Sequence, residues 1–576
     1  MNVLSNSLFA KVLTATLLLG LAFNTSAQSN NSAGLDFDPK IDGFSFANYR
    51  NVGNWQDDLG ADDLIKLFGL KTACKTGTNA SNCVLHVAAE KWKNEILEGM
   101  NIGHCEGIAV ASLRIKTEQA FKKRTFPEQF QPGAKTTFSL SRNQLIENYI
   151  SYFWVTQTFE EIKRQSDETV KRGPLWIAQT IQASTNEKKD TYLIEMFKYE
   201  KNRISDGHAV APIAVEETAD RYKIHVYDNN YPGETRFIYV SKTGNQRWEY
   251  SSKSDAKAKP DYIGDSSTPT FRLTATKWRE NKCFKSTWRK DLDTEGCGAT
   301  ADLLNRSLFT NASFQTNSFI RTDEDDYETA DFFLTGEGEM LVTDGNGKRI
   351  GYDPKSDRFY EDIPRSNTDL LIGGFGEDLP HYTVPYEDSD QTYKIVFSGK
   401  YLDKKESELD FVYSGPGFTV GFDGILLDQG ETLEATISND GQKITFKASK
   451  DGETPEVFYA FDPDEDEVAS YSSMIEGVQL TAGKSLTYDF DIENGKLFFT
   501  DDDGNEDDYD ITLIRVNGDG TKQVYKQEDL DIGKADKYEM DFGDWDGEGE
   551  MCFKDDEDDN GFDDEKCTEE PNENTQ

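Results

Sequence analysis

The sequence predicts a multidomain protein with an α+β domain first, all-β sandwich domains second and an acidic tail at the end. Apolar residues recur at helical spacing up to about residue 183, and strand-like alternation replaces that spacing after Thr191. From about residue 330 onward, short β-branched and aromatic runs alternate with Asp-Gly and Asn-Gly turns. Helices followed by an antiparallel sheet indicate an α+β domain, and the later pattern is typical of β-sandwiches.

The N-terminus has the pattern of an export signal. A lysine precedes an apolar run over residues 12–23, and small residues follow it up to Ala27. This order is typical of a secretory signal peptide, so we expect residues 1–27 to be cleaved off. No later segment approaches the roughly 18 consecutive apolar residues that a membrane span needs. The sequence therefore predicts a secreted protein, extracellular or periplasmic, without a membrane span.

Helices are the first elements expected after the signal. Residues 62–100 carry two apolar helical patterns, which a disulfide between Cys74 and Cys83 would join. A capping-box pattern from Ser141 precedes an expected helix over residues 145–153, and Pro174 fits the first turn of a helix over residues 175–181. The strands that follow share β-branched and aromatic residues between polar turns, and are expected over residues 192–197, 208–215, 222–227 and 236–240.

Charge divides the chain of 576 residues into two parts. Residues 321–576 hold 69 acidic and 22 basic residues, whereas residues 1–320 hold 37 acidic and 40 basic residues. This break predicts a domain boundary, and the expected units are an α+β domain over residues 28–318, sandwiches over 319–405 and 406–525, and an acidic tail over 526–576. A strongly anionic surface excludes nucleic acid as a partner and favours divalent cations or basic partners.

The acidic tail contains a candidate calcium loop. Asp556, Asp558 and Asn560 supply oxygen ligands at alternate positions, and Gly561 follows them as a turn glycine. The closing glutamate of such a loop is missing, because position 567 is a cysteine. Asp462 belongs to one of several looser acidic clusters. Structural calcium and a solvated or disordered acidic surface both fit these patterns.

The chain has seven cysteines, and six of them form short-range pairs. The pairs expected in an oxidising compartment are Cys74 with Cys83, Cys283 with Cys297, and Cys552 with Cys567. The remaining cysteine, Cys105, lies in the segment Gly-His-Cys-Glu-Gly-Ile-Ala, where a glycine ends one helical pattern and the next begins. A helix N-terminus favours the thiolate, so Cys105 is the candidate nucleophile.

Two later segments supply candidate partners for this thiol. If the strands over 208–215 and 222–228 form a hairpin centred on Thr218, His208 lies opposite Asp228, within hydrogen-bonding range. A one-residue register shift would place Asn229 there instead. In this interpretation Cys105 attacks a carbonyl, His208 transfers the proton and Asp228 orients the imidazole. The Cys105 N–H and a nearby amide such as Asn101 would stabilise the oxyanion, and catalysis would require no cofactor.

At these residues the chain resembles the papain-like cysteine peptidases in the broad sense, a clan that includes the bacteriocin-processing peptidases. In that clan a cysteine begins a helix, a histidine opens a strand and an Asn or Asp ends the next strand, in the order of Cys105, His208 and Asp228. The resemblance covers about residues 86–250. Position 99 is a glycine where the clan has a glutamine, and the Asn-Ser-Trp of papain is absent.

The resemblance implies a papain-like α+β domain and a secreted thiol-dependent hydrolase that cleaves peptide or isopeptide bonds of a protein or peptide substrate. Acyl transfer, as in transglutaminases, uses the same residue types. A different class also fits the sequence. In that alternative the protein is a non-enzymatic extracellular adhesion, matrix or calcium-binding protein, its peptidase-like domain is inactive, and Cys105 is a small buried hydrophobic residue.

Overall fold

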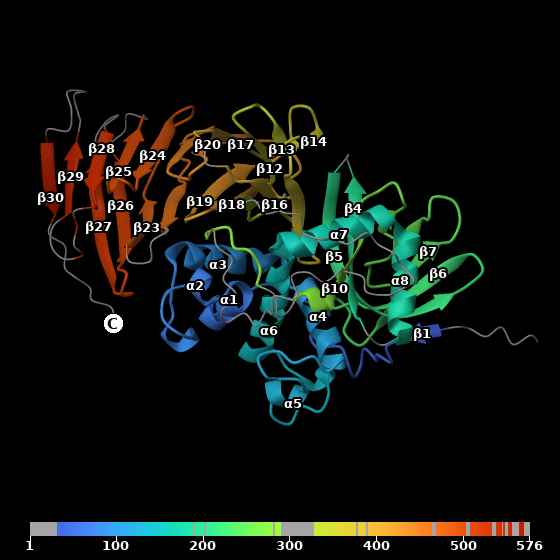
Figure 1. The fold of residues 1–576 in the computed structure, drawn as a ribbon. Helices are drawn as coiled ribbons and strands as arrows, with labels where there is room; N and C mark the ends of the chain where they lie inside the picture. The colour runs from blue at the N-terminus through green and yellow to red at the C-terminus, as the bar shows by residue number, and fades with distance from the viewer. Residues whose placement is uncertain are drawn as a thin grey trace, which may run out of the picture.

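The structure is a computed structural model. It describes residues 32–187, 190–200, 203–279, 283–289, 328–375, 378–387, 390–463, 468–502, 507–532, 537–543, 545, 547, 551–555 and 564–568. The expected signal peptide and the predicted boundary at residues 318 and 319 lie outside the described residues. Figure 1 shows an α+β unit, which the chain forms first, beside a long β-sandwich.

The α+β unit begins with helices, as the sequence predicts. They are α1 (Ala61–Phe68), α2 (Leu70–Ala73), α3 (Val87–Gly99), α4 (Cys105–Lys116), α5 (Pro127–Phe130), α6 (Gln144–Val155), α7 (Glu160–Arg172) and α8 (Pro174–Glu187), with the 3-10 turns η1 (Trp55–Asp57), η2 (Ala80–Asn82), η3 (Met100–Ile102), η4 (Thr137–Ser139), η5 (Thr156–Thr158) and η6 (Thr276–Arg279). Pro174 opens α8 as expected. The N-cap of α6 is Asn143 and not Ser141, because the Asn143 side chain accepts from the backbone N–H groups of Leu145 and Ile146.

The antiparallel sheet of this unit follows the helices. Among the described residues its spatial order is β10 (Phe271–Ala275), β4 (Tyr192–Glu200), β5 (Arg203–Glu217), β6 (Arg221–Tyr227), β7 (Thr235–Ser241), β8 (Trp248–Tyr250) and β9 (Tyr262–Gly264), and β1 (Ser32–Gly34) pairs with β5. The strands are amphipathic: in β7, for example, buried residues alternate with partly exposed ones. The period of two lets one face of the strand meet the core.

The register between β5 and β6 differs from the expected hairpin. Ala211 pairs with Tyr227 and Pro212 with Val226, so position 208 is in line with 230 rather than 228. A β-bulge at Ile213 adds one unpaired residue, and the turn closes between Thr218 and Arg221. The observed shift of two residues near His208 keeps its side chain on the expected face, since side chains alternate with a period of two.

The acidic half forms two long antiparallel sheets. The described strands of the first sheet, in spatial order, are β15 (Asn367–Ile372), β16 (Asp378–Pro385), β11 (Thr329–Leu334), β18 (Glu406–Gly415), β19 (Phe418–Asp428), β22 (Glu456–Phe461), β23 (Ser470–Glu476), β26 (Asp507–Val516) and β27 (Lys522–Ile532). Those of the second are β14 (Arg358–Glu361), β13 (Arg349–Asp353), β12 (Glu339–Thr343), β17 (Thr392–Ser398), β20 (Thr432–Ser438), β21 (Lys443–Lys447), β24 (Ser485–Asp491), β25 (Lys496–Asp501), β28 (Lys537–Asp541), β29 (Met551–Asp555) and β30 (Asp564–Thr568).

The prediction of two sandwiches divided near residue 405 differs from this arrangement. The predicted boundary between residues 405 and 406 falls at the start of β18, but each sheet continues past this point, and one apolar core extends from Ala330 to Phe553. The predicted tail over residues 526–576 contributes β28, β29 and β30 to the second sheet. The turns look alike along the whole segment, so local sequence does not reveal which strands share a core.

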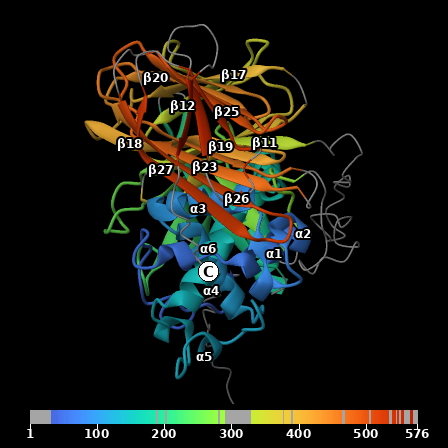
Figure 2. The same cartoon turned by 90° about the vertical axis from the view of Figure 1, so that its left-hand side faces the viewer.

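The middle of the first sheet, at β22, is buried on both faces. In β22, Val457 and Tyr459 belong to the sandwich core, whereas Phe458 and Ala460 pack into the core of the α+β unit. Figure 2 shows α3 beneath β18, β19 and β23. The molecule is therefore three-layered where the two units meet, with the second sheet, the first sheet and the helices stacked in that order.

Polar contacts also join α3 to the sandwich. Asp462 accepts from the Ala88 N–H at 2.7 Å, from His86 Nδ1 and from Ser470, and so caps the N-terminus of α3 from a distant part of the chain. In the same interface Lys91 pairs with Asp423 at 2.9 Å. These contacts account for Asp462, one of the loosely clustered acidic residues, without a metal ion.

The disulfide between Cys74 and Cys83 is present. It closes the loop from β2 (Cys74–Thr76) to β3 (Val84–Leu85). Residues 84 and 85 were expected to be helical, but they form the strand β3. Cys283 and Cys552 are also disulfide-bonded, and Cys567 lies opposite Cys552 in the ladder between β29 and β30. Cys297 lies outside the described residues. Among the helices that the structure describes, none is long and apolar enough to cross a membrane.

Candidate active site

Cys105 is the first residue of α4 and is completely buried. It is the free cysteine among those in the described residues. Gly103, at a φ of 116°, separates η3 from α4 in a backbone conformation that favours glycine. Gly107 brings α4 against α6, since a Cβ there would lie 2.1 Å from the Ile150 carbonyl oxygen. The thiol is thus fixed at a helix N-terminus within the core.

His208 in β5 and Asp228 after β6 form a buried pair. His208 Nε2 lies 2.8 Å from Asp228 Oδ1. The Asp228 carboxylate also accepts from the Asn230 backbone N–H at 2.8 Å and from the Tyr250 hydroxyl. Because the carboxylate has several donors, it is held in place and can fix the orientation of the imidazole.

Asn229, the alternative orienting residue, has another role. Its Nδ2 donates to the Cys105 carbonyl at 2.8 Å and to the Ala209 carbonyl at 3.1 Å. It therefore ties the start of α4 to β5, next to the cysteine and the histidine. The structure brings Cys105, His208, Asp228 and Asn229 into one cluster.

The imidazole and the thiol are neighbours. A Cβ on Gly374 would lie 2.6 Å from His208 Nδ1 and 2.9 Å from Cys105 Cβ, so the two side chains border the same small space. His208 Nδ1 is buried and has no hydrogen-bond partner among the described residues. With Nε2 engaged by Asp228, Nδ1 is the nitrogen available to exchange a proton with the sulfur.

Burial and neighbouring charges shift the pKa values of His208, Asp228 and Cys105. Burial by itself would lower the pKa of His208, but the Asp228 carboxylate, with smaller contributions from Cys105, outweighs burial and raises the pKa to about 10. Burial would raise the pKa of Asp228, and the His208 charge holds it below its ordinary value instead. Burial raises the pKa of Cys105, and the nearby imidazole only partly opposes this effect. The carboxylate thus stabilises the protonated form of the imidazole, which is the form that His208 takes when it accepts a proton.

Two N–H donors converge on one carbonyl oxygen beside the thiol. Asn48 Nδ2 donates to the Gly373 oxygen at 2.7 Å, and the Cys105 backbone N–H donates to the same oxygen at 3.4 Å. The amide is itself held, because Asn48 Oδ1 accepts from the His104 N–H at 2.7 Å and the Tyr49 N–H at 3.0 Å. A side-chain amide paired with the backbone N–H of a cysteine is a donor set that could serve as an oxyanion hole.

Asn101, the expected second donor, is exposed in η3, where its carbonyl oxygen accepts from Arg50. Sequence reasoning missed Asn48. The residue lies in a segment rich in aromatic residues ahead of the expected helices, and its spacing from Cys105 carries no signal. It also missed Gly373 and Gly374. A pair of glycines between two strands was the only sign that this loop needs an unusual backbone.

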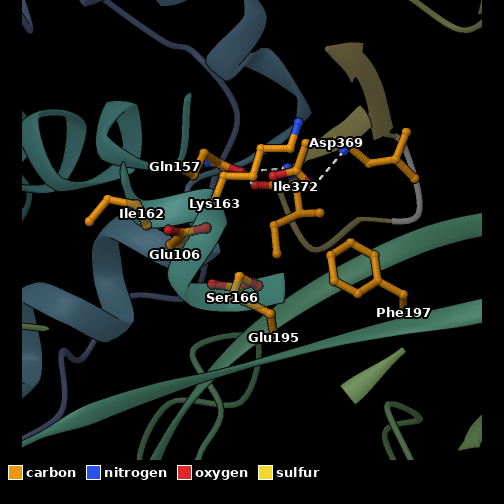
Figure 3. A pocket seen from close by; sticks show the side chains of 10 residues that line it. Glu106, Gln157, Ile162, Lys163, Ser166, Glu195, Phe197, Asp369 and Ile372 are labelled. Atoms are coloured by element: carbon orange, nitrogen blue, oxygen red, sulfur yellow. Dashed lines mark hydrogen bonds between the residues drawn. The ribbon is translucent and has the colours of Figure 1, made fainter. Parts of the chain in front are cut away.

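The four residues from Ile372, the last residue of β15, to Phe375 are here called the inserted segment, and they enter the cluster. Ile372 is fixed by two side chains of the α+β unit: its N–H donates to Gln157 Oε1 at 2.8 Å, and its oxygen accepts from Trp154 Nε1 at 3.1 Å. Figure 3 shows Gln157 reaching Ile372 at the edge of a small pocket. Further along, Asn230 Nδ2 donates to the Gly374 oxygen at 2.9 Å.

Two residues that flank Cys105 have structural roles. The His104 imidazole stacks on Tyr49 and hydrogen-bonds to the Tyr49 carbonyl, and burial lowers its pKa to about 4. Glu106 points to the other side of α4, into the pocket of Figure 3, where it pairs with the buried Arg279. Burial raises the pKa of Glu106 to about 8 although Arg279 opposes this effect.

The calcium candidates Asp556, Asp558 and Asn560 lie outside the described residues. Within the residues that are described, no group of three or more His, Cys, Asp and Glu side chains is arranged to hold a metal ion. No family model, curated protein or solved structure matches the chain.

Proposed function

We propose that the protein is a secreted thiol-dependent peptidase that cleaves peptide or isopeptide bonds through Cys105, His208 and Asp228. One observation carries the proposal: a peptide carbonyl, that of Gly373, lies between the Asn48 amide and the Cys105 N–H. A nucleophile, an oriented imidazole and a donor pair around one carbonyl are the groups that acyl-transfer chemistry requires.

The chemistry assigns each group a step. The Cys105 sulfur attacks the carbonyl carbon, and its proton passes to His208 Nδ1. The oxygen of the tetrahedral intermediate takes negative charge between Asn48 and the Cys105 N–H. His208 then gives the proton to the leaving amine as the C–N bond breaks, and a thioester remains on Cys105. Water, deprotonated by His208, hydrolyses the thioester and regenerates the thiol.

The test is hydrolysis of an unfolded protein and of mixed fluorogenic peptides by the full chain. We expect Cys105→Ala and His208→Gln to abolish turnover. His225→Gln is the matched control, because His225 also pairs with a carboxylate, Glu216 at 2.8 Å, but elsewhere on the sheet. It should retain wild-type turnover and a wild-type thermal midpoint.

Because the inserted segment fills the site, each variant is also measured with Gly373→Ala. A Cβ on Gly373 would lie 2.0 Å from the Ile102 carbonyl oxygen, so the alanine displaces the segment. A lack of turnover caused by the inserted segment blocking the site can then be told apart from a lack of turnover caused by inactive catalytic groups. Equal turnover with and without Cys105 in both backgrounds refutes the proposal. If the Cys105 thiol of the Gly373→Ala chain does not react with iodoacetamide, the result favours the non-enzymatic alternative.

A further inference from the structure

The inserted segment lies in the candidate site as a substrate would, although it belongs to the same chain. Its residues are contacted one after another by groups of the α+β unit: Ile372 by Gln157 and Trp154, Gly373 by Asn48 and Cys105, and Gly374 by Asn230. Phe375 then lies under the Arg50 guanidinium at 5.1 Å. Contacts to successive backbone groups on both sides of one peptide bond are how a peptidase cleft holds an extended peptide.

The direction of the segment suits cleavage after Gly373. The Gly373 oxygen accepts from the donor pair, and the Cys105 sulfur lies 3.9 Å from the oxygen of Ile372, the residue before Gly373. The next residue, Gly374, is against the imidazole, because a Cβ on it would lie 2.6 Å from His208 Nδ1. The amine that would leave on cleavage is therefore on the side of the group that protonates it.

Glycine is required at both positions of this bond. A Cβ on Gly373 would lie within 2.2 Å of two backbone atoms of Ile102, and Gly374 has a φ of 86°. Before them, Ile372 is buried against Gly207, where a Cβ would lie 2.1 Å from Ile372 Cγ2. The cleft and the segment thus fit each other closely, with an apolar side chain in a pocket ahead of two glycines.

We propose that the Gly373–Gly374 peptide bond is the protein's own intramolecular substrate, cut by Cys105 of the same chain. The inference rests on the proposed function. The Cys105 sulfur bonds to the Gly373 carbonyl carbon, the C–N bond to Gly374 breaks, and the Gly374 amine takes the thiol proton through His208. Water then releases Gly373 as a carboxylate. Since the bond and the cysteine belong to one chain and lie in one cluster, the reaction is unimolecular.

The cut chain stays assembled. β15 ends at Ile372 and β16 begins at Asp378, and the two strands pair from Asn367 opposite Thr383 to Ile372 opposite Asp378. On the first fragment, β11 also pairs with β16 and β18 of the second. Cleavage is therefore invisible to size-exclusion chromatography and has to be read under denaturing conditions.

The experiment follows purified full-length protein over time by denaturing electrophoresis and intact mass. We expect conversion to two fragments, one ending at Gly373 and one beginning with Gly374-Phe375. The fraction cut at each time should not change over an order of magnitude in protein concentration. Cys105→Ala should remain uncut, slower by at least about 10³-fold. Gly373→Ala should also remain uncut, yet hydrolyse added peptides faster than Cys105→Ala.

Gly345→Ala is the matched control, because Gly345 lies in the β12–β13 turn and an added Cβ would approach no atom nearer than the Gln391 Cβ at 3.2 Å. It should be cut at the wild-type rate. If Gly373→Ala does not fold, Gly374→Ala replaces it. A chain that hydrolyses added peptides through Cys105 but keeps the Gly373–Gly374 bond overturns this inference and leaves the proposed function standing. So does a cutting rate that rises with protein concentration. If the Cys105 thiol is unreactive in every variant that contains it, both this inference and the proposed function are wrong.

Discussion

Replacing Asn48 with aspartate isolates the oxyanion donor. The Asn48 amide uses its two ends differently: Oδ1 accepts from the backbone N–H groups of His104 and Tyr49, and Nδ2 donates to the Gly373 oxygen at 2.7 Å. Asn48→Asp preserves both acceptor bonds and turns the donor into an oxygen. Removing one oxyanion donor costs about 2.7–4 kcal/mol of transition-state stabilisation, so kcat should fall about 10²- to 10³-fold.

Asn48→Ala serves as the comparison variant. It leaves the buried N–H groups of His104 and Tyr49 without their acceptor, which costs about 1–3 kcal/mol for each group. The alanine variant should therefore lose stability as well as rate, and the aspartate variant should lose rate with the smaller loss of stability. The assay is peptide hydrolysis in the Gly373→Ala background, with urea unfolding of each chain.

Asn51→Asp is the control, because Asn51 donates to the Leu97 carbonyl at 2.7 Å and has no part in the cluster. It should keep the parent kcat. If Asn48→Asp retains kcat within about threefold of the parent, corresponding to less than 1 kcal/mol, the assignment of Asn48 as an oxyanion donor is wrong.

Three further predictions concern the same structure. Asp228→Asn should reduce kcat by about 10⁴-fold with little change in KM, because the imidazole loses its orienting acceptor; unchanged kcat would show that Asp228 is not the orienting residue. In the uncut Cys105→Ala chain, the Asp228 carboxylate raises the folded pKa of His208 above its ordinary 6.5, so the charged His208–Asp228 pair stabilises the fold below pH 6.5 and this stability is lost as pH rises through the folded pKa. The excess unfolding free energy over His208→Gln should therefore shrink with rising pH, by about 1.4 kcal/mol for each unit by which the folded pKa exceeds 6.5, while His225→Gln shows no such trend; a constant difference would contradict the charged pair. Replacing both Cys74 and Cys83 with serine should lower the unfolding free energy by about 2–3 kcal/mol, since the bridge closes a short loop with a sequence separation of 9; an unchanged urea midpoint would contradict this value.

Local patterns predicted the elements of the α+β unit well. The strands expected at 192, 208, 222 and 236 are β4, β5, β6 and β7, because alternation and turn residues act over a few positions. His208 and Asp228 lie together as expected, although the predicted strand register was wrong. The bulge at Ile213 was not visible in the sequence, but a shift of two residues preserves the face on which a side chain lies.

The remaining parts depend on contacts between distant residues. Asn48 and Gly373 are 325 positions apart, and Cys105 and Ile372 are 267 apart. Neither periodicity nor capping signals extend so far, so nothing in the sequence joined the glycine pair to the thiol. The same limit explains the single sandwich core: strands on both sides of residue 405 have similar patterns, and only their pairing reveals that they share one interior.

The packing of α3 constrains the order in which the newly made chain can fold. Thr419 donates to the Ala88 carbonyl across 331 positions, and Lys91 reaches Asp423 across 332. During synthesis, α3 therefore emerges long before its neighbours exist, and closing so long a loop is slow. A chain truncated ahead of β19 would expose this helix to water. The helix that carries Cys105 belongs to the same core, so under the proposed function we expect activity to arise only after the second half of the polypeptide has folded onto the first.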